Sequence, residues 1–475
     1  MKSATMSLYI TLFTIALFFT NVLAFVAMYV RSRKQSQTGE KRSYGFFHPY
    51  CNAAGGGERV LWTAIFTIQE TYPDVAIVIY TGDTDATPDE IIVNAERVFQ
   101  VRLLRPVQFV YLQSRFLLEA KYYPVFTLLL QSLASVLVGL EAILKFTPDV
   151  YFDTMGFAFT LPVFKMFGGC QTASYVHFST ISTDMLCAVH SRRPGVTNRE
   201  VICRSRILSI AKLIYYKAFA AIYGWIGCLF SDTTMVNSSW TNGHVSEIWG
   251  VTCHLLYPPC SVEKFYDLKS IANPEKEFRI VSLAQFRPEK DHLKQLAALK
   301  VLQKQLAPEE FQRVKLVLVG SCRNQEDQER VQDLKLQTDF LELSDNVEFA
   351  VDVQFSELKK EMAKASAAIH TMWNEHFGIA VVECLAAGLI TVVHDSGGPK
   401  EDIIRPGCGF TAITAEDFAK QIAQIIRMTP SERQKISDAA KRSMDRFTEG
   451  KFKSRFLKIV RTYIENQRPA ERITT

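Results

Sequence analysis

Apolar and polar positions alternate along the chain in two separate series. In the first half, short apolar runs are separated by stretches with helical spacing, such as residues 58–69. The runs that predict strands are 46–48, 75–80, 107–112, 150–152 and 173–177. Strands that alternate with helices predict a parallel, doubly wound sheet.

The pattern breaks near Pro258-Pro259 and over a polar stretch at residues 267–276, and a second series then begins. Its predicted strands are 279–283, 315–319, 347–349, 368–371 and 390–394, and its predicted helices are 292–305, 326–338, 356–365 and 379–387. We therefore predict an α/β protein with two Rossmann-like halves that face one cleft.

The N-terminal segment fits neither series. Residues 7–30 are nearly all apolar and uncharged, and this length is enough to cross a bilayer. Residues 31–42 carry five Lys or Arg residues, against the lone Lys2 on the other side. Because positive charge favours the cytosolic side, we predict one transmembrane anchor with the bulk of the chain in the cytosol. The alternative is a cleaved signal peptide, which has a shorter apolar core and a small-residue cleavage site.

Two further apolar stretches are candidates for membrane contact. Ile207 to Phe230 mixes aromatic residues with Lys212 and Lys217, which is typical of a helix in the membrane interface, and residues 125–144 are a weaker example. For both, the alternative is a core-facing helix of the N-terminal half. Additional spans are not expected, because they would interrupt the alternation of strands and helices.

Length and composition add modest limits. A chain of 475 residues with 48% hydrophobic content suffices for two domains and an appendage. The net charge of +5 favours an anionic ligand or an anionic membrane surface, and no basic tract is dense enough to indicate nucleic-acid binding. The ten cysteines form no C-x-x-C pair, which argues against structural zinc and predicts free thiols in a reducing compartment.

The stretch from Glu375 to Glu383 carries the strongest chemical signal. An apolar run at 367–372 predicts a buried strand before it, and the run after Gly378 predicts a helix that ends at Gly388. One carboxylate is therefore expected on a strand-to-helix loop, and the other on the first turns of the helix.

The same loop is a candidate anion site. The backbone N–H groups of Phe377, Gly378 and Ile379 would lie at the start of a helix, where negative charge is favoured. Two carboxylates around an anion site fit a sugar nucleotide. A hydrolase acid/base pair is the alternative for Glu375 and Glu383, and it requires both carboxyl groups to flank one bond.

Two loops are further candidates for ligand binding. Gly55, Gly56 and Gly57 lie between a predicted strand and a predicted helix, so their backbone can approach an anionic group closely. Arg287 and Lys290 follow the first strand of the second half, where two cations would neutralise a diphosphate. Taken alone, these features also fit a flexible turn and a solvated charge pair.

His177 ends a predicted strand, which places it towards the edge where ligands bind, although a lone histidine is usually structural. Asp83 and Asp85 form a D-x-D pattern that can bind metal. Gly82 before them and Pro88 after them indicate a surface turn with capping aspartates, so no metal site is predicted.

Together these residues resemble the retaining GT-B glycosyltransferases of the glycogen-synthase-like and sucrose-synthase-like superfamily. Glu375 and Glu383 match its Glu-x7-Glu motif, and Lys290 matches its diphosphate-binding lysine. A closer resemblance is to one branch, the eukaryotic GDP-mannose-dependent α-1,2-mannosyltransferases of asparagine-linked glycosylation. It is carried by 48–62, 175–177, 236–240, 257–260 and 370–383, within a match from about residue 44 to 405.

The resemblance implies transfer of mannose, with retention, from GDP-mannose to a dolichol-diphosphate-linked oligosaccharide, in two successive α-1,2 additions. It implies a reaction without metal or cofactor at the cytosolic face of the endoplasmic reticulum membrane. Glu383 would hold the ribose hydroxyls, Glu375 would contact the transferred sugar, and His177 would lie near the mannose. Lys290 and the glycine loop would hold the diphosphate. Other mannosyltransferases of the pathway are candidate partners.

One position departs from the superfamily pattern. Many relatives carry an arginine where Gln285 stands, and Arg287 could take over that charge. The residues by themselves leave two other functions open: a transferase for another lipid acceptor, and a membrane-tethered scaffold without catalysis. Guanine and linkage specificity are implied only by the resemblance.

The predicted organisation is a lumenal tail (1–6), a single transmembrane anchor (7–30), a basic linker (31–43), an N-terminal Rossmann-like acceptor domain (44–262) with a candidate interfacial helix (207–230), a C-terminal Rossmann-like nucleotide-sugar domain (263–448) and a C-terminal amphipathic helix (449–475).

Overall fold

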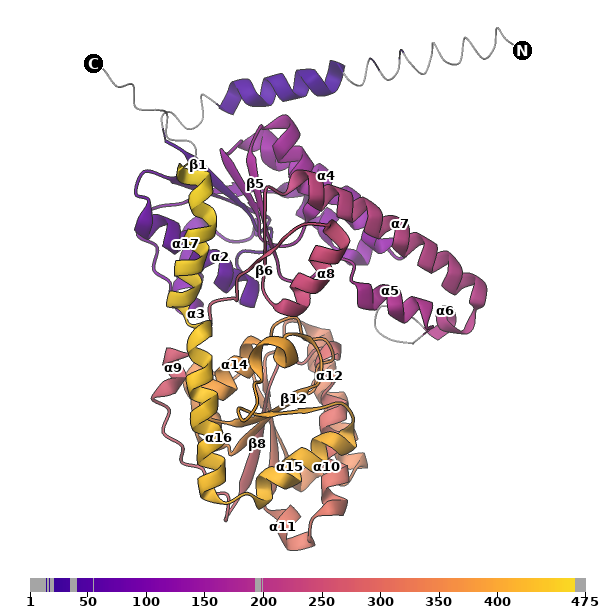
Figure 1. Cartoon of the computed structure of the whole chain (residues 1–475), viewed down its shortest axis with the longest axis vertical. Helices are drawn as coiled ribbons and strands as arrows, with labels where there is room; N and C mark the ends of the chain where they lie inside the picture. The colour runs from indigo at the N-terminus through magenta and orange to yellow at the C-terminus, as the bar shows by residue number, and fades with distance from the viewer. Residues whose placement is uncertain are drawn as a thin grey trace. The chain divides into compact units, whose positions relative to one another are not determined.

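Residues 14, 17, 21–34, 41–53, 55–192, 198 and 200–465 are described by the computed structural model, with side chains up to residue 462. Within them the chain divides into two compact units (Figure 1). The first unit runs through Val236 and adds residues 242–255 and the chain from Arg455 onward. The second unit comprises residues 237–241 and 256–454. Residues 256–262, which the predicted organisation placed in the N-terminal domain, thus belong to the second unit.

The predicted anchor, residues 7–30, lies mostly outside the described residues. Its last part is helical, within a helix over residues 21–34. Val30 is buried in the core of the first unit, and the Arg31 guanidinium donates a hydrogen bond to the carbonyl oxygen of Met166 at 2.8 Å. The C-terminal end of this helix is therefore packed against the first unit.

Within the described residues, the first unit holds a seven-stranded parallel sheet in the order β3-β2-β1-β4-β5-β6-β7. Its strands are β1 (Ser43–Phe47), β2 (Ala76–Thr81), β3 (Gln108–Tyr111), β4 (Val150–Asp153), β5 (Gln171–Val176), β6 (Thr233–Val236) and β7 (His254–Leu255). All five residues of β1 are buried, as expected for a central parallel strand covered on both faces. The winding direction reverses between β1 and β4.

The connections of this sheet are helical. The helices are α2 (Gly56–Thr71), α3 (Pro88–Phe99), α4 (Thr127–Lys145), α5 (Thr183–His190), α6 (Glu200–Arg204), α7 (Arg206–Phe230) and α8 (Ser239–Trp249). Short helical turns cover η1 (Gln113–Leu118), η2 (Ala120–Tyr122), η3 (Ala158–Thr160) and η4 (Val163–Phe167).

Helices α4 and α7 are long and apolar enough to cross a bilayer by length and composition, and less than half of each apolar stretch is buried. Each nevertheless connects two strands of the same sheet, β3 to β4 and β5 to β6. Helices α5 and α6 pack along α7 (Figure 1).

The second unit repeats the architecture, with six described parallel strands in the order β10-β9-β8-β11-β12-β13. The strands are β8 (Phe278–Leu283), β9 (Val314–Gly320), β10 (Val347–Val351), β11 (Ala367–His370), β12 (Ile390–His394) and β13 (Phe410–Ala412). The helices are α9 (Glu263–Tyr266), α10 (His292–Gln305), α11 (Pro308–Gln312), α12 (Gln325–Phe340), α13 (Phe355–Lys364), α14 (Ile379–Ala386), α15 (Ala415–Arg427), α16 (Pro430–Ser443) and α17 (Glu449–Glu465). Short turns cover η5 (Pro288–Lys290), η6 (Ser344–Asn346), η7 (Pro399–Ile403) and η8 (Met444–Phe447).

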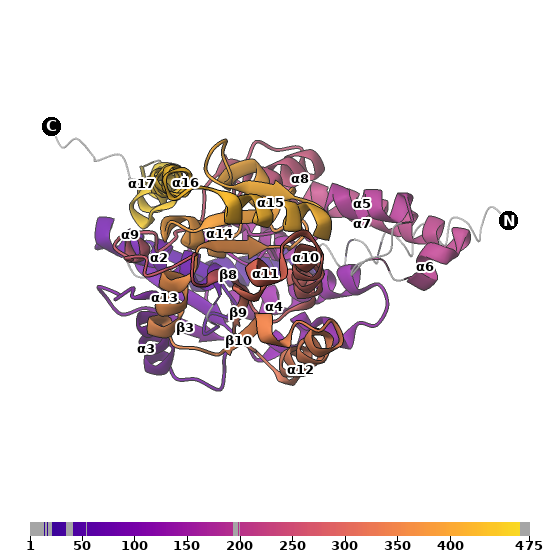
Figure 2. The same ribbon diagram turned by 90° about the horizontal axis from the view of Figure 1, so that it is seen from below.

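Two cores flank the second sheet. Figure 2 shows its first strands between α9 and α13 on one side and α10 and α12 on the other. Successive residues of β8 point to opposite cores, with Ile280 packing towards α10 and Val281 towards α14. Helix α17 contributes to both units, and the ring of Phe456, from its later part, lies 6.3 Å from the ring of Phe152 in the first sheet.

Candidate active site

The site residues of the second unit lie where its sheet reverses direction. Doubly wound sheets bind ligands at the carboxyl ends of the strands, at the point where strand order reverses. That point falls between β8 and β11. Lys290 follows β8 and Glu375 follows β11. The topology therefore brings together two residues that are 85 positions apart in the sequence.

Lys290 and Glu375 form an ion pair. The Nζ of Lys290 lies 2.5 Å from Oε2 of Glu375, and Nε2 of His370 lies 3.1 Å from the same oxygen. The Sδ of Met372 is a further neighbour of the ammonium, at 3.2 Å. All three charged or polar side chains are largely buried, so these contacts are strong ones.

The environment keeps Glu375 ionised. Burial alone would raise the pKa of this carboxyl, but the charge of Lys290 and the hydrogen bond from His370 outweigh it and hold the pKa well below its usual range. The carboxylate can therefore accept hydrogen bonds, such as those of sugar hydroxyls, throughout the physiological pH range.

The two loops that carry Lys290 and Glu375 are joined through Thr371. Its hydroxyl lies 2.9 Å from the carbonyl oxygen of Lys290 and 3.0 Å from that of Asp291, and it accepts a hydrogen bond from the Gln295 amide. Asp291 has a φ of 52°, a left-handed conformation that is uncommon for a residue other than glycine. Such backbone is typical of functional sites that the surrounding structure holds in place.

Gly397 and Gly398, in the loop after β12, support the Glu375 loop, and this role was not predicted. Gly397 has a φ of 66°, and a Cβ there would lie 2.3 Å from the carbonyl oxygen of Glu375. The N–H of Gly398 donates to that carbonyl oxygen at 2.8 Å, and the hydroxyl of Ser396 accepts from the N–H of Asn374 at 2.8 Å. The sequence signal was present, since these glycines follow a predicted strand as Gly55 does.

The Glu-x7-Glu helix has its predicted ends. Gly378 precedes α14 with a φ of 102°, and Gly388 follows it with a φ of 85°. Glu383 lies half-buried on the helix. The first N–H groups of a helix have no partner inside it, so Phe377, Gly378 and Ile379 are placed to bind an anion. Anion binding by them stays a prediction.

Arg287 forms an ion pair with Glu289 in the loop after β8 and is half exposed. This geometry is that of a solvated charge pair, the alternative raised by the sequence. A role for Arg287 at a diphosphate stays a prediction.

Residues 237–241 contribute to the same unit. The Trp240 ring lies 5.1 Å from the His376 ring, beside Glu375 in the sequence. The buried Asp402 carboxylate accepts hydrogen bonds from the N–H and hydroxyl of Ser239, at 2.7 and 2.6 Å, and from the hydroxyl of Tyr257 at 2.8 Å. These contacts hold the segment beside the Glu375 loop.

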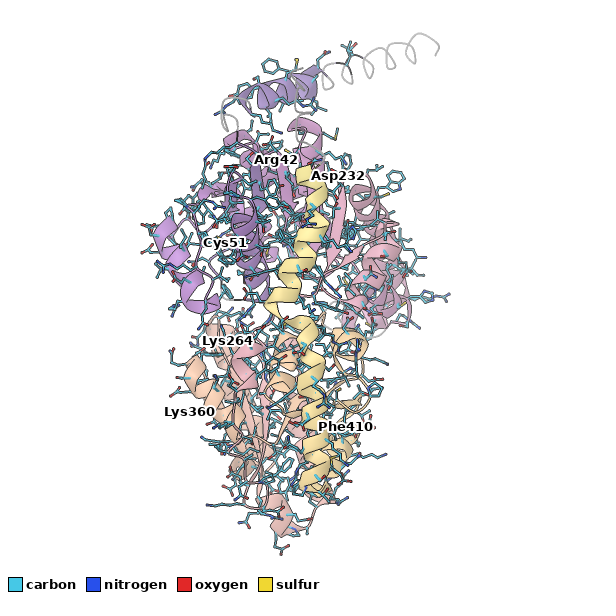
Figure 3. All side chains as sticks on the ribbon, turned by 60° about the vertical axis from the view of Figure 1, so that its left-hand side comes forward. Arg42, Cys51, Asp232, Lys264, Lys360 and Phe410 are labelled. Atoms are coloured by element: carbon cyan, nitrogen blue, oxygen red, sulfur yellow. The ribbon has the colours of Figure 1, made fainter. Side chains whose placement is uncertain are left out.

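In the first unit, the glycine loop begins α2 and is held by Glu58. Gly55 is the N-cap residue, and its N–H donates to Oε2 of Glu58 at 2.7 Å. The other oxygen of Glu58 accepts from His48 Nε2 at 3.0 Å, and His48 Nδ1 lies 2.8 Å from the Thr154 hydroxyl. Burial would raise the pKa of Glu58, but His48 and the Gly55 N–H hold it below its ordinary value. The supporting roles of His48 and Glu58 were not predicted. Cys51, labelled in Figure 3, lies in the same loop.

His177 follows β5 and lies beside the glycine loop. A Cβ at Gly57 would lie 3.5 Å from Nε2 of His177, so the imidazole is within van der Waals reach of the loop. The Tyr175 ring packs 4.8 Å from the imidazole. The fold therefore brings together the two features of the first unit that the sequence singled out.

Asp153 ends β4 and is a third polar group at this edge. Its Oδ1 accepts hydrogen bonds from the N–H groups of Met155 and Gly156, both at 3.1 Å. Its Oδ2 is buried and meets no hydrogen-bond donor among the described residues. Burial raises the pKa of Asp153 to about 6. Sequence reasoning missed this residue, because nothing in a single aspartate after an apolar run indicates its burial.

Asp83 is held by protein groups rather than placed in a metal-binding cluster. One carboxylate oxygen accepts from the N–H of Asn52 at 2.9 Å and from the hydroxyl of Thr81 at 3.0 Å. The other pairs with Arg115 at 2.5 Å. Across the described part of the chain, no group of three or more His, Cys, Asp and Glu side chains is arranged to hold a metal ion.

Comparisons with known proteins identify the family of the chain. Residues 41–249 match the family described as ALG11 mannosyltransferase N-terminus, and residues 264–443 match glycosyl transferases group 1. A protein of Homo sapiens named GDP-Man:Man(3)GlcNAc(2)-PP-Dol alpha-1,2-mannosyltransferase is 48% identical over 87% of this chain and 86% of its own length. A Xenopus tropicalis protein of the same name is 47% identical over 90% of this chain and 89% of its own. The chain belongs to this family.

Solved structures show the fold. HepE from Anabaena in complex with UDP has a TM-score of 0.60 at 15% identity, covering 89% of this chain and all of that one. Sucrose-phosphate synthase from Thermosynechococcus elongatus has a TM-score of 0.63 at 12% identity, covering 90% of this chain and all of that one. The predicted GT-B class with two Rossmann-like units and the predicted family are both confirmed.

Proposed function

We propose that this chain transfers mannose from GDP-mannose, with retention, to a dolichol-diphosphate-linked oligosaccharide, forming successive α-1,2 linkages. The observation that carries the proposal is the identity of 47–48% over most of the chain to relatives named for this reaction. The contact between Lys290 and Glu375 supports it, because the chain keeps both groups that the chemistry uses. Another lipid acceptor or a non-catalytic scaffold has no comparable support.

The second unit binds the donor. Lys290 exchanges its contact with Glu375 for the diphosphate, which it neutralises together with the N–H groups of Phe377, Gly378 and Ile379. The freed carboxylate of Glu375 then faces the transferred mannose. Glu383 holds the ribose hydroxyls, and Arg287 is a second cation for the diphosphate. In the first unit, Gly55 to Gly57 help to hold the diphosphate, and His177 lies near the mannose.

The transfer step needs no carboxylate nucleophile. The oxygen of the acceptor hydroxyl bonds to the anomeric carbon while the bond from that carbon to the diphosphate oxygen breaks. The proton of the hydroxyl passes to the leaving phosphate oxygen on the same face, so the configuration is retained. Catalysis then rests on stabilising charge that develops on the diphosphate, which a buried cation and helix N–H groups do well.

The exposed apolar faces of α4 and α7 lie on the membrane that holds the lipid acceptor. On α7, Ile207 is 80% exposed and Trp225 is 75% exposed, while Phe219 and Tyr223 on the other face are buried. Lys212 and Lys217 on the same helix suit an anionic surface. This arrangement supports contact with a membrane. The proposed location is the endoplasmic reticulum membrane, with one anchor at residues 7–30 and the catalytic region in the cytosol, as the charge pattern of the sequence predicts.

A direct assay tests the proposed reaction. The purified full-length chain in detergent is incubated with GDP-mannose and a lipid-linked trimannosyl acceptor, and products are followed by mass spectrometry. We expect one and then two added hexoses, both removed by an α-1,2-mannosidase, and no transfer from UDP-glucose. Preferred mannosylation of a competing inositol phospholipid would contradict the acceptor, and tight GDP binding without turnover on any acceptor would indicate a scaffold.

Single variants test the roles of the ion pair. Lys290→Ala and Glu375→Ala should each lower kcat by about 10²- to 10³-fold, the usual effect of removing a group that stabilises charge in the transition state. The exposed Lys360→Ala, on α13 of the same unit, is the matched control and should keep full activity. If Lys290→Ala retained most of its turnover, the leaving-group role would be wrong.

A further inference from the structure

Glu375 has two partners in the second unit, and they reach it from different places. Lys290 approaches from the turn after β8, and His370 approaches from the end of β11, the strand that leads into the Glu375 loop. Both contact the same carboxylate oxygen, Oε2, at 2.5 and 3.1 Å. The carboxylate is therefore held by one partner from a neighbouring strand and one from its own.

The two partners differ in how firmly they are fixed. The ammonium of Lys290 is carried on four methylene groups, and it has the Sδ of Met372 as an alternative neighbour. His370 is the last residue of β11, where it lies opposite Val393 of β12, and it is only 5% exposed. The Lys290 side chain can therefore turn to another anion, whereas the imidazole is short, buried and attached to the end of a strand.

We propose that His370 is a positioning residue, which keeps the Glu375 carboxylate in place when Lys290 turns to the diphosphate of the donor. The inference rests on the proposed function, because it is the donor that draws Lys290 away. A buried carboxylate that loses its only cation is unstable unless another donor satisfies it. The N–H at Nε2 of His370 is that donor, and it fixes the orientation in which Glu375 meets the sugar.

Two substitutions separate the hydrogen bond from the bulk of the ring. His370→Phe keeps a ring of similar volume and removes the donor, while His370→Gln keeps an N–H donor on a flexible side chain. For His370→Phe we expect kcat with GDP-mannose to fall about 10- to 100-fold, the loss that follows when a hydrogen bond to a charged group is removed. His370→Gln should recover part of that loss.

The affinity for GDP distinguishes a positioning role of His370 from a merely structural one. GDP lacks the mannose that Glu375 contacts, so its Kd, measured by calorimetry, should stay within about threefold of the unchanged chain in both variants. A parallel loss of GDP affinity and kcat would mean that His370 only supports the fold of the unit. His254→Phe, at an exposed histidine of the first unit, controls for the substitution itself.

A double-mutant cycle tests whether His370 acts through Glu375. If it does, Glu375→Gln combined with His370→Phe should be no slower than Glu375→Gln alone, because the interaction is already lost. Multiplied losses would overturn the proposal and make His370 a direct contact of the donor.

Failure of the proposed function can be distinguished from failure of the positioning role of His370. An unchanged chain that neither binds nor turns over GDP-mannose would contradict the proposed function itself. An active unchanged chain whose His370→Phe and His370→Gln variants are equally active would contradict only the positioning role. Should His370→Phe fail to fold, His370→Leu, which also removes the donor, carries the test, and full activity of that variant would again contradict the role.

Discussion

At the scale of single residues, the two units share one arrangement, a glutamate that is held by a histidine. Each has a largely buried glutamate near the carboxyl edge of its sheet, Glu58 in the first unit and Glu375 in the second. Each carboxylate contacts a histidine from a nearby strand or strand end, His48 or His370, at 3.0 or 3.1 Å. In each case burial opposes ionisation and the partners outweigh it. Both loops are therefore positioned by charge as well as by packing.

Asp153 is a buried carboxyl without such a partner, and this should be visible in the pH dependence of stability. Its pKa is raised from 3.8 to about 6 by burial. Between these values the native state keeps a proton that the unfolded chain has released, so stability falls as pH rises through this window. The full effect is on the order of 3 kcal/mol.

Asp153→Asn removes that titration. The difference in unfolding free energy, variant minus unchanged chain, should therefore increase between pH 4 and pH 8. Denaturant unfolding of the purified chain at several pH values measures it, with Asp89→Asn, at an exposed position of α3, as control. A difference that is constant with pH would show that Asp153 titrates normally in the native state.

At the scale of elements, the loops after β8, β11 and β12 form one support for Glu375. Thr371 ties the first two loops together, and Gly397 and Gly398 pack directly on the backbone of Glu375. The side chain of Glu375 is therefore placed by three separate strand ends. A substitution in the loop after β12 should therefore displace the Glu375 carboxylate, although the substituted residue itself does not contact the substrate.

Gly397→Ala tests this support. The new Cβ would lie 2.3 Å from the Glu375 carbonyl oxygen at a φ of 66°, so the loop must shift. Displacement of a site residue by about 1 Å can cost on the order of 100-fold in rate, and we expect a fall in kcat of that size.

Gly407→Ala is a matched control for that variant. Gly407 also has a positive φ, 79°, but a Cβ there would meet no atom within 4 Å among the described residues. This variant should lose about 1 kcal/mol of stability from backbone strain alone and keep its activity. Equal activity of the two variants would show that the glycine pair does not position Glu375.

At the scale of the whole molecule, the first unit carries a large exposed apolar surface and the second carries the charged site. The surface comes from α4 and α7, which are structural crossovers of the sheet and yet expose much of their apolar length. A water-exposed surface of this kind is unusual unless it binds a partner or a membrane. Membrane contact was proposed above for this surface, and it can be tested.

Membrane contact through α7 can be separated from the anchor. A chain that begins at residue 21 keeps the packing of Val30 and should still bind vesicles of phosphatidylcholine and phosphatidylserine. Adding Ile210→Gln, Ile214→Gln and Trp225→Gln should weaken binding by about tenfold or more in flotation assays, because each exposed apolar side chain contributes of the order of 1 kcal/mol or more.

The matched control replaces exposed apolar residues by glutamine on a helix of the second unit. Leu336→Gln and Phe340→Gln replace exposed apolar residues of α12 and should leave vesicle binding unchanged. If the α7 variant bound as well as this control, the exposed face of α7 would not be the membrane contact.

Local pattern was sufficient for much of the fold and part of the site. The periodicity of apolar residues predicted most strands of both sheets, because burial on one or two faces leaves its spacing in the sequence. The short strands β6, β7 and β13 were not predicted. Gly378 and Gly388 marked the ends of α14, since both adopt a left-handed backbone that other residues avoid. Lys290, Glu375 and His177 were placed at strand ends for the same local reasons.

Only the tertiary structure decided which of these groups touch. Strand order places β11 beside β8, and nothing in the spacing of apolar residues specifies that order. The contact of Lys290 with Glu375 follows from that order. The contacts of Gly397 with Glu375 and of His48 with Glu58, and the burial of Asp153, likewise depend on how each chain segment packs in its unit. By itself the sequence determined which polar and charged residues stand at strand ends and helix starts, because residue type and local backbone preference are properties of the sequence. Their partners and ionisation depend on distances between strand ends, which exist only once the sheets have formed.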